Sequence, residues 1–379
     1  MKVLILGAGQ MSRGLIHDFL QQKDLEKVTV IDRSMEALNS LKAHFKNNNR
    51  LHSRQVAAEN QNDLVALFKE ANGTVSALPY DFNLNLTGLA IDNHCHFVDL
   101  GGNNRVVKEQ FKLHDKARNA GIGVVPDCGL APGMVSVISA GLIDEFARVD
   151  HLRIRVGGLP VFPKQPLNYM LVFSVHGLIN EYLEPAVFLR DGKIVTAPSL
   201  TDVEELEFPR PFGLMEAFIT SGGTSTLPET YEGLIDNLDY KTIRYPGHCH
   251  IMKAMIDLGF ASWELLGNCN ISFREAFEAM LSRALSYQDE DVVLIRISAE
   301  GRKAGSRKFV RLQAIQYGDK SAGLTAMMRT TAFPAAIILQ MLIRNQIKER
   351  GVLKQELSVP ARLFMEELEM RDIHFDRND

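Results

Sequence analysis

The most constraining feature of this sequence is a glycine turn that follows an apolar run at its amino end. Residues 2–6 (Lys-Val-Leu-Ile-Leu) are long enough for a buried strand, and Gly7-Ala8-Gly9 comes directly after them. Apolar side chains then recur at helical spacing, and a second apolar run, 28–31, ends at Asp32. Strand, glycine turn, helix, strand and acidic residue is the order of a dinucleotide-binding unit.

Each part of this stretch meets a physical requirement of a bound pyrophosphate. Gly7 allows the tight turn out of the strand, and Gly9 lets backbone amides approach the phosphates without an intervening Cβ. The helix that starts near Gln10 and Met11 offers unpaired N–H groups and a partial positive charge. Ser12 stands where the usual motif has glycine or alanine, and it is small enough for close packing. We expect Gly7, Gly9, Gln10 and Met11 to contact a dinucleotide.

The end of the second strand predicts which dinucleotide binds. Asp32 suits a carboxylate that accepts hydrogen bonds from the adenine ribose hydroxyls, and its charge would repel a 2′-phosphate. Arg33 weakens this argument, because an arginine there can stack on adenine or pair with that phosphate. We expect NAD as the cofactor, with NADP as the less favoured alternative.

Strands and helices continue to alternate up to residue 125. Apolar runs at 74–78, 96–100 and 122–125 predict strands, and the segments between them have helical spacing. This alternation is typical of the α/β class with a doubly wound parallel sheet, a Rossmann domain. Ligands of such sheets lie beyond the carboxyl ends of the strands. Leu78, Pro79 and Gly101 are therefore expected to contact the nicotinamide half of the cofactor.

A rigid segment closes this first half. Residues 126–133 (Pro-Asp-Cys-Gly-Leu-Ala-Pro-Gly) contain two prolines and two glycines just past a strand end. Asp127 is then held where the sheet and a second domain should meet, which favours a functional role. The alternative is a plain helix cap, because an apolar helix follows at 135–142.

Length and composition exclude several classes of protein. A chain of 379 residues is long enough for two domains with sizeable cores. A net charge of −4 and an estimated pI of 6.3 give no indication of a nucleic-acid or membrane partner. Four cysteines do not provide a disulfide framework, and a strand that begins at residue 2 leaves no room for a signal peptide. The apolar stretch 332–343 is shorter than a bilayer requires. We expect a cytoplasmic protein.

The pattern changes after residue 149. Strand-like runs follow one another without regular helical crossovers, which predicts a second α+β domain with a mixed or antiparallel sheet. Predicted strands lie at 151–156, 169–173, 187–195 (a hairpin turning at 191–192), 216–220, 241–245, 292–298 and 308–316. Helices are predicted at 248–258 and 273–285, and a long one at 325–347, broken or kinked near Pro334. We expect a Rossmann domain over 1–130, a substrate and dimerisation domain over 131–324, and C-terminal helices over 325–379 that return to the first domain.

Two stretches of the second domain have the chemistry of an anion site. Residues 220–226 are rich in hydroxyls and free amides, which suits a carboxylate or phosphate, although an exposed loop has the same composition. Substrate contacts are expected from Thr220, Ser221, Gly222, Gly223 and Thr224. The strand 241–245 places Thr242 and Arg244 on one face, and arginine is the natural bidentate partner of a carboxylate. The alternative for Arg244 is a surface ion pair.

The histidines of the chain give a weaker signal. His94-Cys95-His96 and His248-Cys249-His250 lack the spacing and the additional ligands of a metal site, so no metal is expected. His176 and His248 are candidate proton carriers, although a structural histidine is an equally good interpretation.

Beyond the glycine turn, the chain resembles the saccharopine dehydrogenase-like family, and within it the lysine 6-dehydrogenase group. The resemblance runs nearly the whole length, and two segments, 216–227 and 240–248, are much more specific than the glycine turn. The other matching pieces are Gly7-Ala8-Gly9 with Met11, Ala77-Leu78 with Tyr80, 98–102, Pro126-Asp127 with 131–134, 156–158 and 172–174. The sequence departs from the family at Ser12 and Cys128.

This resemblance implies an enzyme that uses NAD to oxidise the ε-amine of L-lysine. The product would be 2-aminoadipate 6-semialdehyde, which cyclises, and ammonia and NADH would leave. It also implies a homodimer formed through the second domain. In such a reaction Arg244 and the 220–224 loop would hold the carboxylate, and Asp127 would pair with an ammonium group. The ε-ammonium group must lose a proton before hydride leaves. Tyr80, Asp127, His176 and His248 are the candidates for that base.

Two alternatives remain at this point. The first is a secondary-amine oxidoreductase of the saccharopine reductase or carboxynorspermidine dehydrogenase kind. A saccharopine reductase must bind a second dicarboxylate, for which Arg153, Arg155, Arg210 and Lys241 are available. A dinucleotide-binding protein without turnover would keep the glycine turn but could lose the polar groups of the site. The second alternative is less favoured, because Tyr80, Asp127, Thr224 and Arg244 are all present.

Overall fold

The computed structural model describes residues 1–379 and divides into two compact units. The first unit consists of Met1–Leu142, Lys320–Leu324 and Met328–His374, and the second of Ile143–Asp319, Thr325–Met327 and Phe375–Asp379. The first unit therefore extends twelve residues beyond the expected boundary at 130, because helix α7 (Met134–Ile143) belongs largely to it. Most of the segment 325–379 lies in the first unit, but Thr325–Met327 and the last five residues belong to the second.

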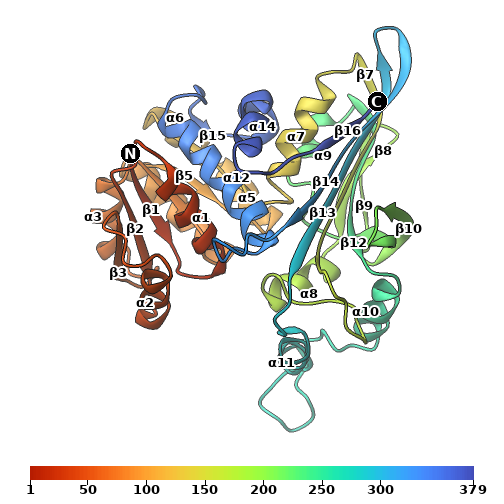
Figure 1. Cartoon of the computed structure of the whole chain (residues 1–379), viewed down its shortest axis with the longest axis horizontal. Coiled ribbons are helices and arrows are strands. Elements are labelled where there is room, and N and C mark those ends of the chain that lie inside the picture. Colours follow the sequence, from red (N-terminus) through yellow and green to blue (C-terminus); the bar gives the residue numbers. More distant parts are fainter. The chain divides into compact units, whose positions relative to one another are not determined.

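A seven-stranded parallel sheet forms the centre of the first unit, which confirms the predicted α/β fold (Figure 1). The strand order is β15-β6-β5-β4-β1-β2-β3, so the order reverses between β1 and β4 as in a doubly wound sheet. The strands are β1 (Lys2–Leu6), β2 (Lys27–Asp32), β3 (Leu51–Gln55), β4 (Gly73–Ser76), β5 (His96–Asp99), β6 (Gly123–Val125) and β15 (Gly351–Val352). All seven run the same way, so their carboxyl ends share one edge of the sheet.

Helices cover both faces of this sheet. One face packs on α3 (Gln61–Glu70), α4 (Asn83–Asp92) and α6 (His114–Asn119) through the cluster that contains Leu4, Leu6 and Phe97. On the other face, Gly73 and Gly123 carry no side chain, and Leu339 and Leu342 of α12 (Ala326–Ile343) occupy that space. The remaining helices of this unit are α1 (Gln10–Gln21), α2 (Met35–His44), η1 (Tyr80–Phe82), α5 (Asn104–Phe111), α13 (Gln355–Ser358) and α14 (Ala361–Glu369).

One strand of the first unit was not predicted, and two expectations need correction. Strand β3 lies in a segment that has no strand signal, because this edge strand has mostly polar and solvent-accessible side chains. Helix α12 continues through Pro334 without a break. Its 18 residues also make it long and apolar enough to cross a membrane, although 83% of that stretch is buried within the protein, as in a core helix.

The second unit contains a nine-stranded mixed sheet, as predicted. Its main path is β10-β11-β12-β7-β13-β14-β16, and the hairpin β8–β9 pairs with β12. The pair β12–β7 is parallel and all other pairs are antiparallel. The strands are β7 (Arg148–Pro160), β8 (Ala186–Arg190), β9 (Lys193–Ala197), β10 (Thr201–Phe208), β11 (Gly213–Ile219), β12 (Ile235–Arg244), β13 (Asp291–Lys303), β14 (Ser306–Tyr317) and β16 (Asp376–Asn378).

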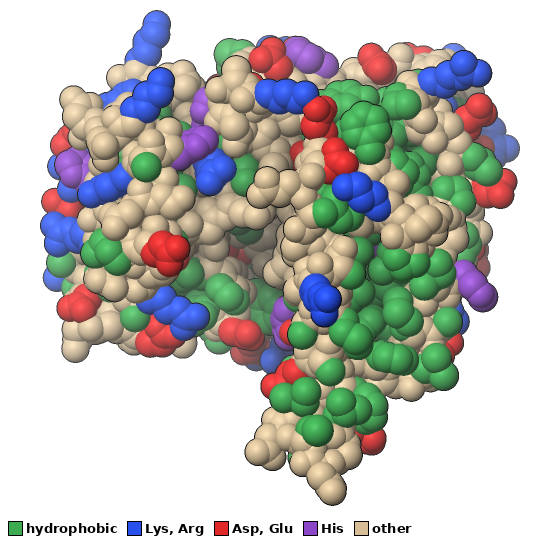
Figure 2. All heavy atoms as spheres, turned by 60° about the horizontal axis from the view of Figure 1, so that its bottom comes forward, with side chains coloured by type: hydrophobic (Ala, Val, Ile, Leu, Met, Phe, Trp, Pro, Cys, Tyr) green, Lys and Arg blue, Asp and Glu red, His purple; other side chains and the backbone are tan.

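Helices cover one face of this sheet near β11 and β12. They are α8 (Val175–Leu183), α10 (His248–Asp257) and α11 (Phe273–Leu285), and Phe218 of β11 packs in the core they form with the sheet. The short helix α9 (Leu227–Tyr231) contacts β8. The segment 169–173 forms no strand, which contradicts the prediction: its apolar side chains bury in this core rather than in a sheet. Apolar side chains also reach the surface of this unit, down to the loop before α11 (Figure 2), where Trp263 is 65% exposed.

Candidate functional site

The glycine turn after β1 has the geometry that the sequence predicts. Gly7 has φ +98°, a conformation that side chains other than glycine rarely adopt, and its N–H donates to the Ile31 carbonyl at 2.8 Å. The Ser12 hydroxyl donates to the Gly7 carbonyl at 2.7 Å. Ser12, which departs from the usual motif, therefore stabilises the turn from its position in helix α1.

The N-terminus of helix α1 is open toward the space where a pyrophosphate would bind. Gly9 is the N-cap of α1, is exposed, and provides no side-chain cap. A Cβ built on Gly9 would meet no atom within 4 Å. Gln10 is also exposed, Met11 is half-buried, and Leu78 lies beside Gly7 with its Cδ2 3.2 Å from the ideal Cβ position. This open cradle at a helix N-terminus fits a dinucleotide pyrophosphate.

Asp32 connects this turn to the end of β2. Its Oδ2 accepts from the Ala8 N–H at 2.8 Å, and its Oδ1 accepts from the Ser34 N–H at 2.7 Å. The residue is half-buried, so its carboxylate keeps lone pairs for ribose hydroxyls. The Arg33 side chain is exposed and makes no hydrogen bond or ion pair, so it is free to move toward an adenosine.

The carboxyl ends of β4, β5 and β6 bring together three of the predicted residues. The ideal Cβ position of Gly101 is 2.1 Å from Oδ1 of Asp127, and that of Gly102 is 3.2 Å from Cδ1 of Tyr80. Asp127 is only 1% exposed and has φ +60°. Pro79, by contrast, is exposed at the start of the loop. Tyr80, Gly101 and Asp127 thus lie together at the sheet edge where the nicotinamide is expected.

A residue that the sequence did not single out, Asp99, holds this edge in place. Its Oδ1 accepts from the backbone N–H groups of Gly101 at 2.9 Å and Asp127 at 3.0 Å, and Gln110 donates to its Oδ2 at 2.8 Å. Burial raises the pKa of Asp99, and these three hydrogen bonds oppose that increase. Gln355 Nε2 also donates to the Asp127 carbonyl at 2.6 Å. The unusual backbone of Asp127 is therefore held from two sides.

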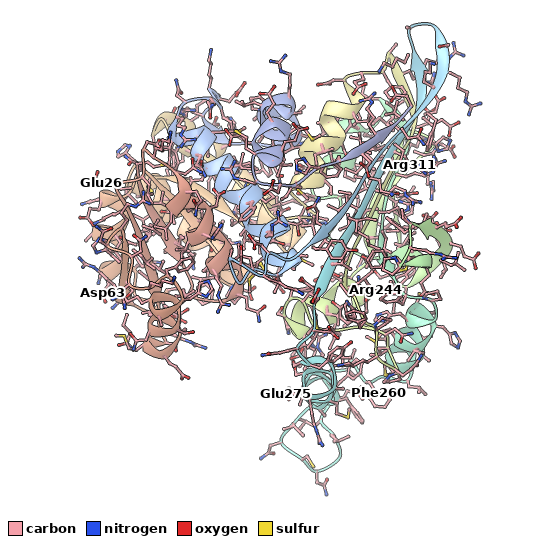
Figure 3. The ribbon with its side chains drawn as sticks, in the orientation of Figure 1. Glu26, Asp63, Arg244, Phe260, Glu275 and Arg311 are labelled. Atoms are coloured by element: carbon pink, nitrogen blue, oxygen red, sulfur yellow. The ribbon has the colours of Figure 1, made fainter.

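Arg244 forms the centre of a polar cluster in the second unit. It lies between the sheet and helices α8 and α10 (Figure 3) and is 2% exposed. Its Nε donates to the Tyr182 hydroxyl at 3.0 Å, its Nη1 donates to the Ile243 carbonyl at 2.9 Å, and its Cζ lies 4.6 Å from the Tyr169 ring centroid. The Arg244 cluster consists of Tyr169, Glu181, Tyr182, Ser221, Tyr240, Thr242, Arg244 and His248.

The charge of Arg244 is not neutralised by an ion pair. No Asp or Glu oxygen lies within 4.0 Å of its guanidinium nitrogens, so the surface ion pair that was its alternative interpretation is absent. Burial lowers the pKa of Arg244. The surrounding tyrosine hydroxyls and the more distant Glu181 outweigh this effect and raise the pKa above its usual value. A buried cation that meets only rings and neutral oxygens is a site that would bind an anion.

His248 supports Arg244 through Tyr182. Its Nδ1–H donates to the Leu167 carbonyl at 2.9 Å, and its Nε2 accepts from the Tyr182 hydroxyl at 3.0 Å, because a carbonyl can only accept. Burial, followed by the charge of Arg244, lowers the pKa of His248 to about 3. A histidine with both nitrogens engaged and this pKa is poorly suited to carry a proton near neutral pH. The structure therefore assigns it a positioning role in place of the expected proton transfer.

The hydroxyl-rich loop after β11 is less available than its composition predicts. Thr220 Oγ1 lies 2.6 Å from Thr242 Oγ1, and Thr224 Oγ1 donates to the Val187 carbonyl at 2.9 Å. Gly223 lies against the Tyr240 ring: the ideal Cβ position of Gly223 is 2.3 Å from Cδ1 of Tyr240. Gly222 has φ +85°. The Ser221 hydroxyl makes no hydrogen bond within the protein. Of the side-chain hydroxyls of Thr220, Ser221 and Thr224, only that of Ser221 makes no hydrogen bond within the protein.

The remaining predicted residue, His176, does not join the Arg244 cluster. It lies near the start of α8 with its side chain 48% exposed, and its Nδ1 lies 3.0 Å from Glu278 of α11. Arg274 Nη2 also donates to its carbonyl at 3.1 Å. His176 is thus part of a surface ion-pair group that joins two helices, and the structure does not support its expected role as a base at this site.

Four members of the Arg244 cluster were missed from the sequence. Tyr240 precedes Thr242 and Arg244 with a period of two, so the strand pattern itself could have revealed it. Tyr169, Glu181 and Tyr182 come from a loop and from α8, and no local pattern connects them to β12. Only the packing of α8 against the sheet brings them together.

Comparisons with known proteins agree with this geometry. The sequence model "Saccharopine dehydrogenase NADP binding domain" matches residues 3–125, and "Saccharopine dehydrogenase C-terminal domain" matches 129–373. An L-glutamate-forming saccharopine dehydrogenase from Pyricularia oryzae is 28% identical over 78% of this chain and 66% of its own length. A carboxynorspermidine synthase from Vibrio cholerae is 25% identical over 94% of this chain and 92% of its own. The chain spans about two thirds of the fungal enzyme and 45% of the rat α-aminoadipic semialdehyde synthase.

Solved structures show the same fold. A saccharopine dehydrogenase (L-Glu forming) from Saccharomyces cerevisiae matches with a TM-score of 0.83 and 19% identity, covering 100% of this chain and 99% of its own. A homospermidine synthase from Legionella pneumophila, solved in complex with NAD, matches with a TM-score of 0.67 and 13% identity, covering 100% of this chain and 91% of its own. Because the second family model alone spans well over half of the residues, the chain belongs to the saccharopine dehydrogenase family.

Proposed function

We propose that this protein is an oxidoreductase that oxidises a C–N bond of an amino acid with a nicotinamide cofactor, and that its reaction is the oxidative deamination of the ε-amine of L-lysine. The observation that carries this proposal is the buried Arg244 without an ion-pair partner. A substrate carboxylate would supply the missing negative charge, and the free Ser221 hydroxyl would donate to it. The similar proteins named above, which act on amino acids or polyamines by their names, agree with an amine substrate.

The second unit favours a substrate with one carboxylate over a dicarboxylate. Strand β12 alternates, so Lys241 lies on the face opposite to Arg244. On that face Arg155 forms ion pairs with Glu204 and Asp239, and Lys241 with Asp202 and Glu204, both at 3.1 Å. The other two cations that could bind a second dicarboxylate are no better placed. Arg153 lies 3.7 Å from Glu300, and Arg210 is exposed. The cations needed for a second dicarboxylate are therefore engaged elsewhere or lie at the surface.

In the proposed reaction, residues of the first unit bind the cofactor and accept a proton. NAD, when bound, accepts the hydride from the ε-carbon. The ε-ammonium group must first lose a proton, and the resulting iminium must gain water to release ammonium and the aldehyde. Tyr80 and Asp127 are the remaining candidates for the proton acceptor, because they lie at the sheet edge beyond β4 and β6. Asp32, with Gly7 and Gly9, would hold the adenosine and pyrophosphate, which favours NAD.

The deciding experiment is an initial-rate assay of NADH formation with the purified protein. L-lysine and saccharopine are tested separately, each with NAD and with NADP, and ammonia is measured in parallel. Turnover of lysine with stoichiometric ammonia supports the proposal. Turnover of saccharopine alone would place the protein among the secondary-amine enzymes, and a parallel test with carboxynorspermidine covers the other member of that group. No turnover in any arm, with tight cofactor binding, would favour a dinucleotide-binding protein without catalysis.

The role of Arg244 has its own test. In Arg244→Ala the carboxylate would lose a buried, hydrogen-bonded charge partner, which costs about 2 kcal/mol or more, or roughly 30-fold in KM. We expect that increase for the amino acid and an unchanged KM for the cofactor. Arg302→Ala, which removes an exposed arginine from β13, is the matched control. A normal KM for the amino acid in Arg244→Ala would contradict the carboxylate assignment.

A further inference from the structure

We propose that Glu181 determines the substrate class of this site, because its carboxylate receives the α-ammonium group of the amino acid whose α-carboxylate binds Arg244. The inference rests on the proposed function and deepens it, since it restricts the substrate to zwitterionic α-amino acids. Neither amines without a carboxylate nor carboxylates without an α-ammonium group would satisfy both side chains.

The position of Glu181 is fixed by helix α8 and the loop after β11. Leu178, Ile179 and Tyr182 of α8 bury in the core of the second unit, which orients the helix. The Glu181 carbonyl accepts from the Ser221 N–H at 3.0 Å, so the residue lies directly beside the loop with the uncommitted hydroxyl. Glu181 itself is half-buried and keeps some access to solvent.

The Glu181 carboxylate has no partner within the protein. It makes no hydrogen bond, and it lies beyond 4.0 Å from the Arg244 nitrogens, so the two opposite charges do not form an ion pair. A carboxylate that is partly removed from water without a partner costs stability, and functional sites retain such groups. The ammonium and carboxylate groups of an α-amino acid are bonded to the same carbon. That zwitterion would place one charge on Arg244 and the other on Glu181.

The electrostatics of the surrounding groups agree with this role. Burial raises the pKa of Glu181 to about 7, and the charge of Arg244 opposes that increase. The other titratable groups that face it are Tyr169 from the preceding loop, Tyr182 from its own helix and Tyr240 from β12, and Glu181 raises the pKa of all three. These phenols stay neutral near pH 7. The cluster thus contains one fixed cation and one carboxyl that changes charge near neutral pH.

The first test compares L-lysine with 6-aminohexanoate, which keeps the carboxylate and the terminal amine but lacks the α-ammonium group. For the wild-type protein we expect kcat/KM to be at least about 30-fold higher with lysine. In Glu181→Gln we expect that ratio to fall below about 3, mainly through the loss of lysine activity. Asp257→Asn removes an exposed carboxylate that pairs with Lys253 at 2.9 Å and should keep the wild-type ratio.

The second test uses the pH dependence, which a merely structural role would not produce. The charged Glu181 is needed for the ammonium group, so the affinity for lysine, measured as 1/Kd by calorimetry, should fall below pH 7 as the carboxyl takes up a proton and give an acidic limb. Glu181→Gln should lack this acidic limb, and Glu181→Asp, which keeps the charge on a shorter side chain, should retain it. Circular dichroism of each variant confirms that the fold is intact.

Calorimetric binding of the same two ligands keeps this inference separate from the proposed reaction. If the wild type binds lysine but does not oxidise it, the proposed reaction fails, and weaker binding of lysine to Glu181→Gln would still support the role of Glu181. If the variant keeps both the lysine preference and the acidic limb, the role of Glu181 is refuted. Equal binding of the two ligands by the wild type, or binding of neither, would refute it as well.

Discussion

The substitution Gly9→Ala separates cofactor binding from stability in the first unit. Gly9 has φ −76° and ψ −172°, which alanine adopts without strain, and its Cβ would meet no protein atom within 4 Å. Alanine reduces the entropy of the unfolded chain, which stabilises by about 0.4–1 kcal/mol. Alanine is also a poorer N-cap than glycine, which costs a similar amount. We therefore expect the free energy of unfolding to change by less than about 1 kcal/mol.

The same methyl group would project into the space assigned to the pyrophosphate. Overpacking of this kind costs about 1–3 kcal/mol, which corresponds to an increase in Kd of roughly 5- to 150-fold. Titration of NADH fluorescence measures the Kd, and thermal unfolding without cofactor measures stability. Gly7→Ala is the contrasting variant: with φ +98° and a Cβ position 3.0 Å from the Ala77 carbonyl, it should be destabilised even without cofactor. Unchanged NADH affinity in Gly9→Ala would refute the assignment of this space.

Two further predictions concern stability. Asp291 accepts hydrogen bonds from the N–H groups of Ala326 at 2.6 Å and Met327 at 2.9 Å at the start of α12. Asp291→Ala should therefore lower the free energy of unfolding in urea by about 2–3 kcal/mol. A decrease below about 0.5 kcal/mol would contradict this capping role. Burial raises the pKa of Glu181 from 4.5 to about 7, so the wild type loses stability as pH rises through that range. Glu181→Gln should therefore match the wild type at pH 4 and exceed it at pH 8, by at most about 3 kcal/mol. Equal thermal stability at pH 8 would contradict a costly, partly buried carboxylate at Glu181.

The sequence by itself determined the features that depend on neighbouring residues. The turn at Gly7, the carboxylate at Asp32 and the parallel α/β sheet follow from local spacing, because a strand, a glycine turn and a helix N-terminus are adjacent in the chain. The period of two in β12 likewise placed Thr242 and Arg244 on one face. Edge strand β3 escaped prediction because a polar edge strand has no hydrophobic pattern.

Only the tertiary structure decided what surrounds Arg244 and which side chains remain available. Tyr169, Glu181 and Tyr182 reach the cluster through the packing of a loop and α8 against the sheet, and no sequence period links them to β12. The same packing engages His248 with Leu167 and Tyr182, and leaves His176 on the surface. A sequence names residue types, whereas burial and hydrogen bonding decide which of them stay charged or uncommitted, and these depend on contacts between segments far apart in the chain.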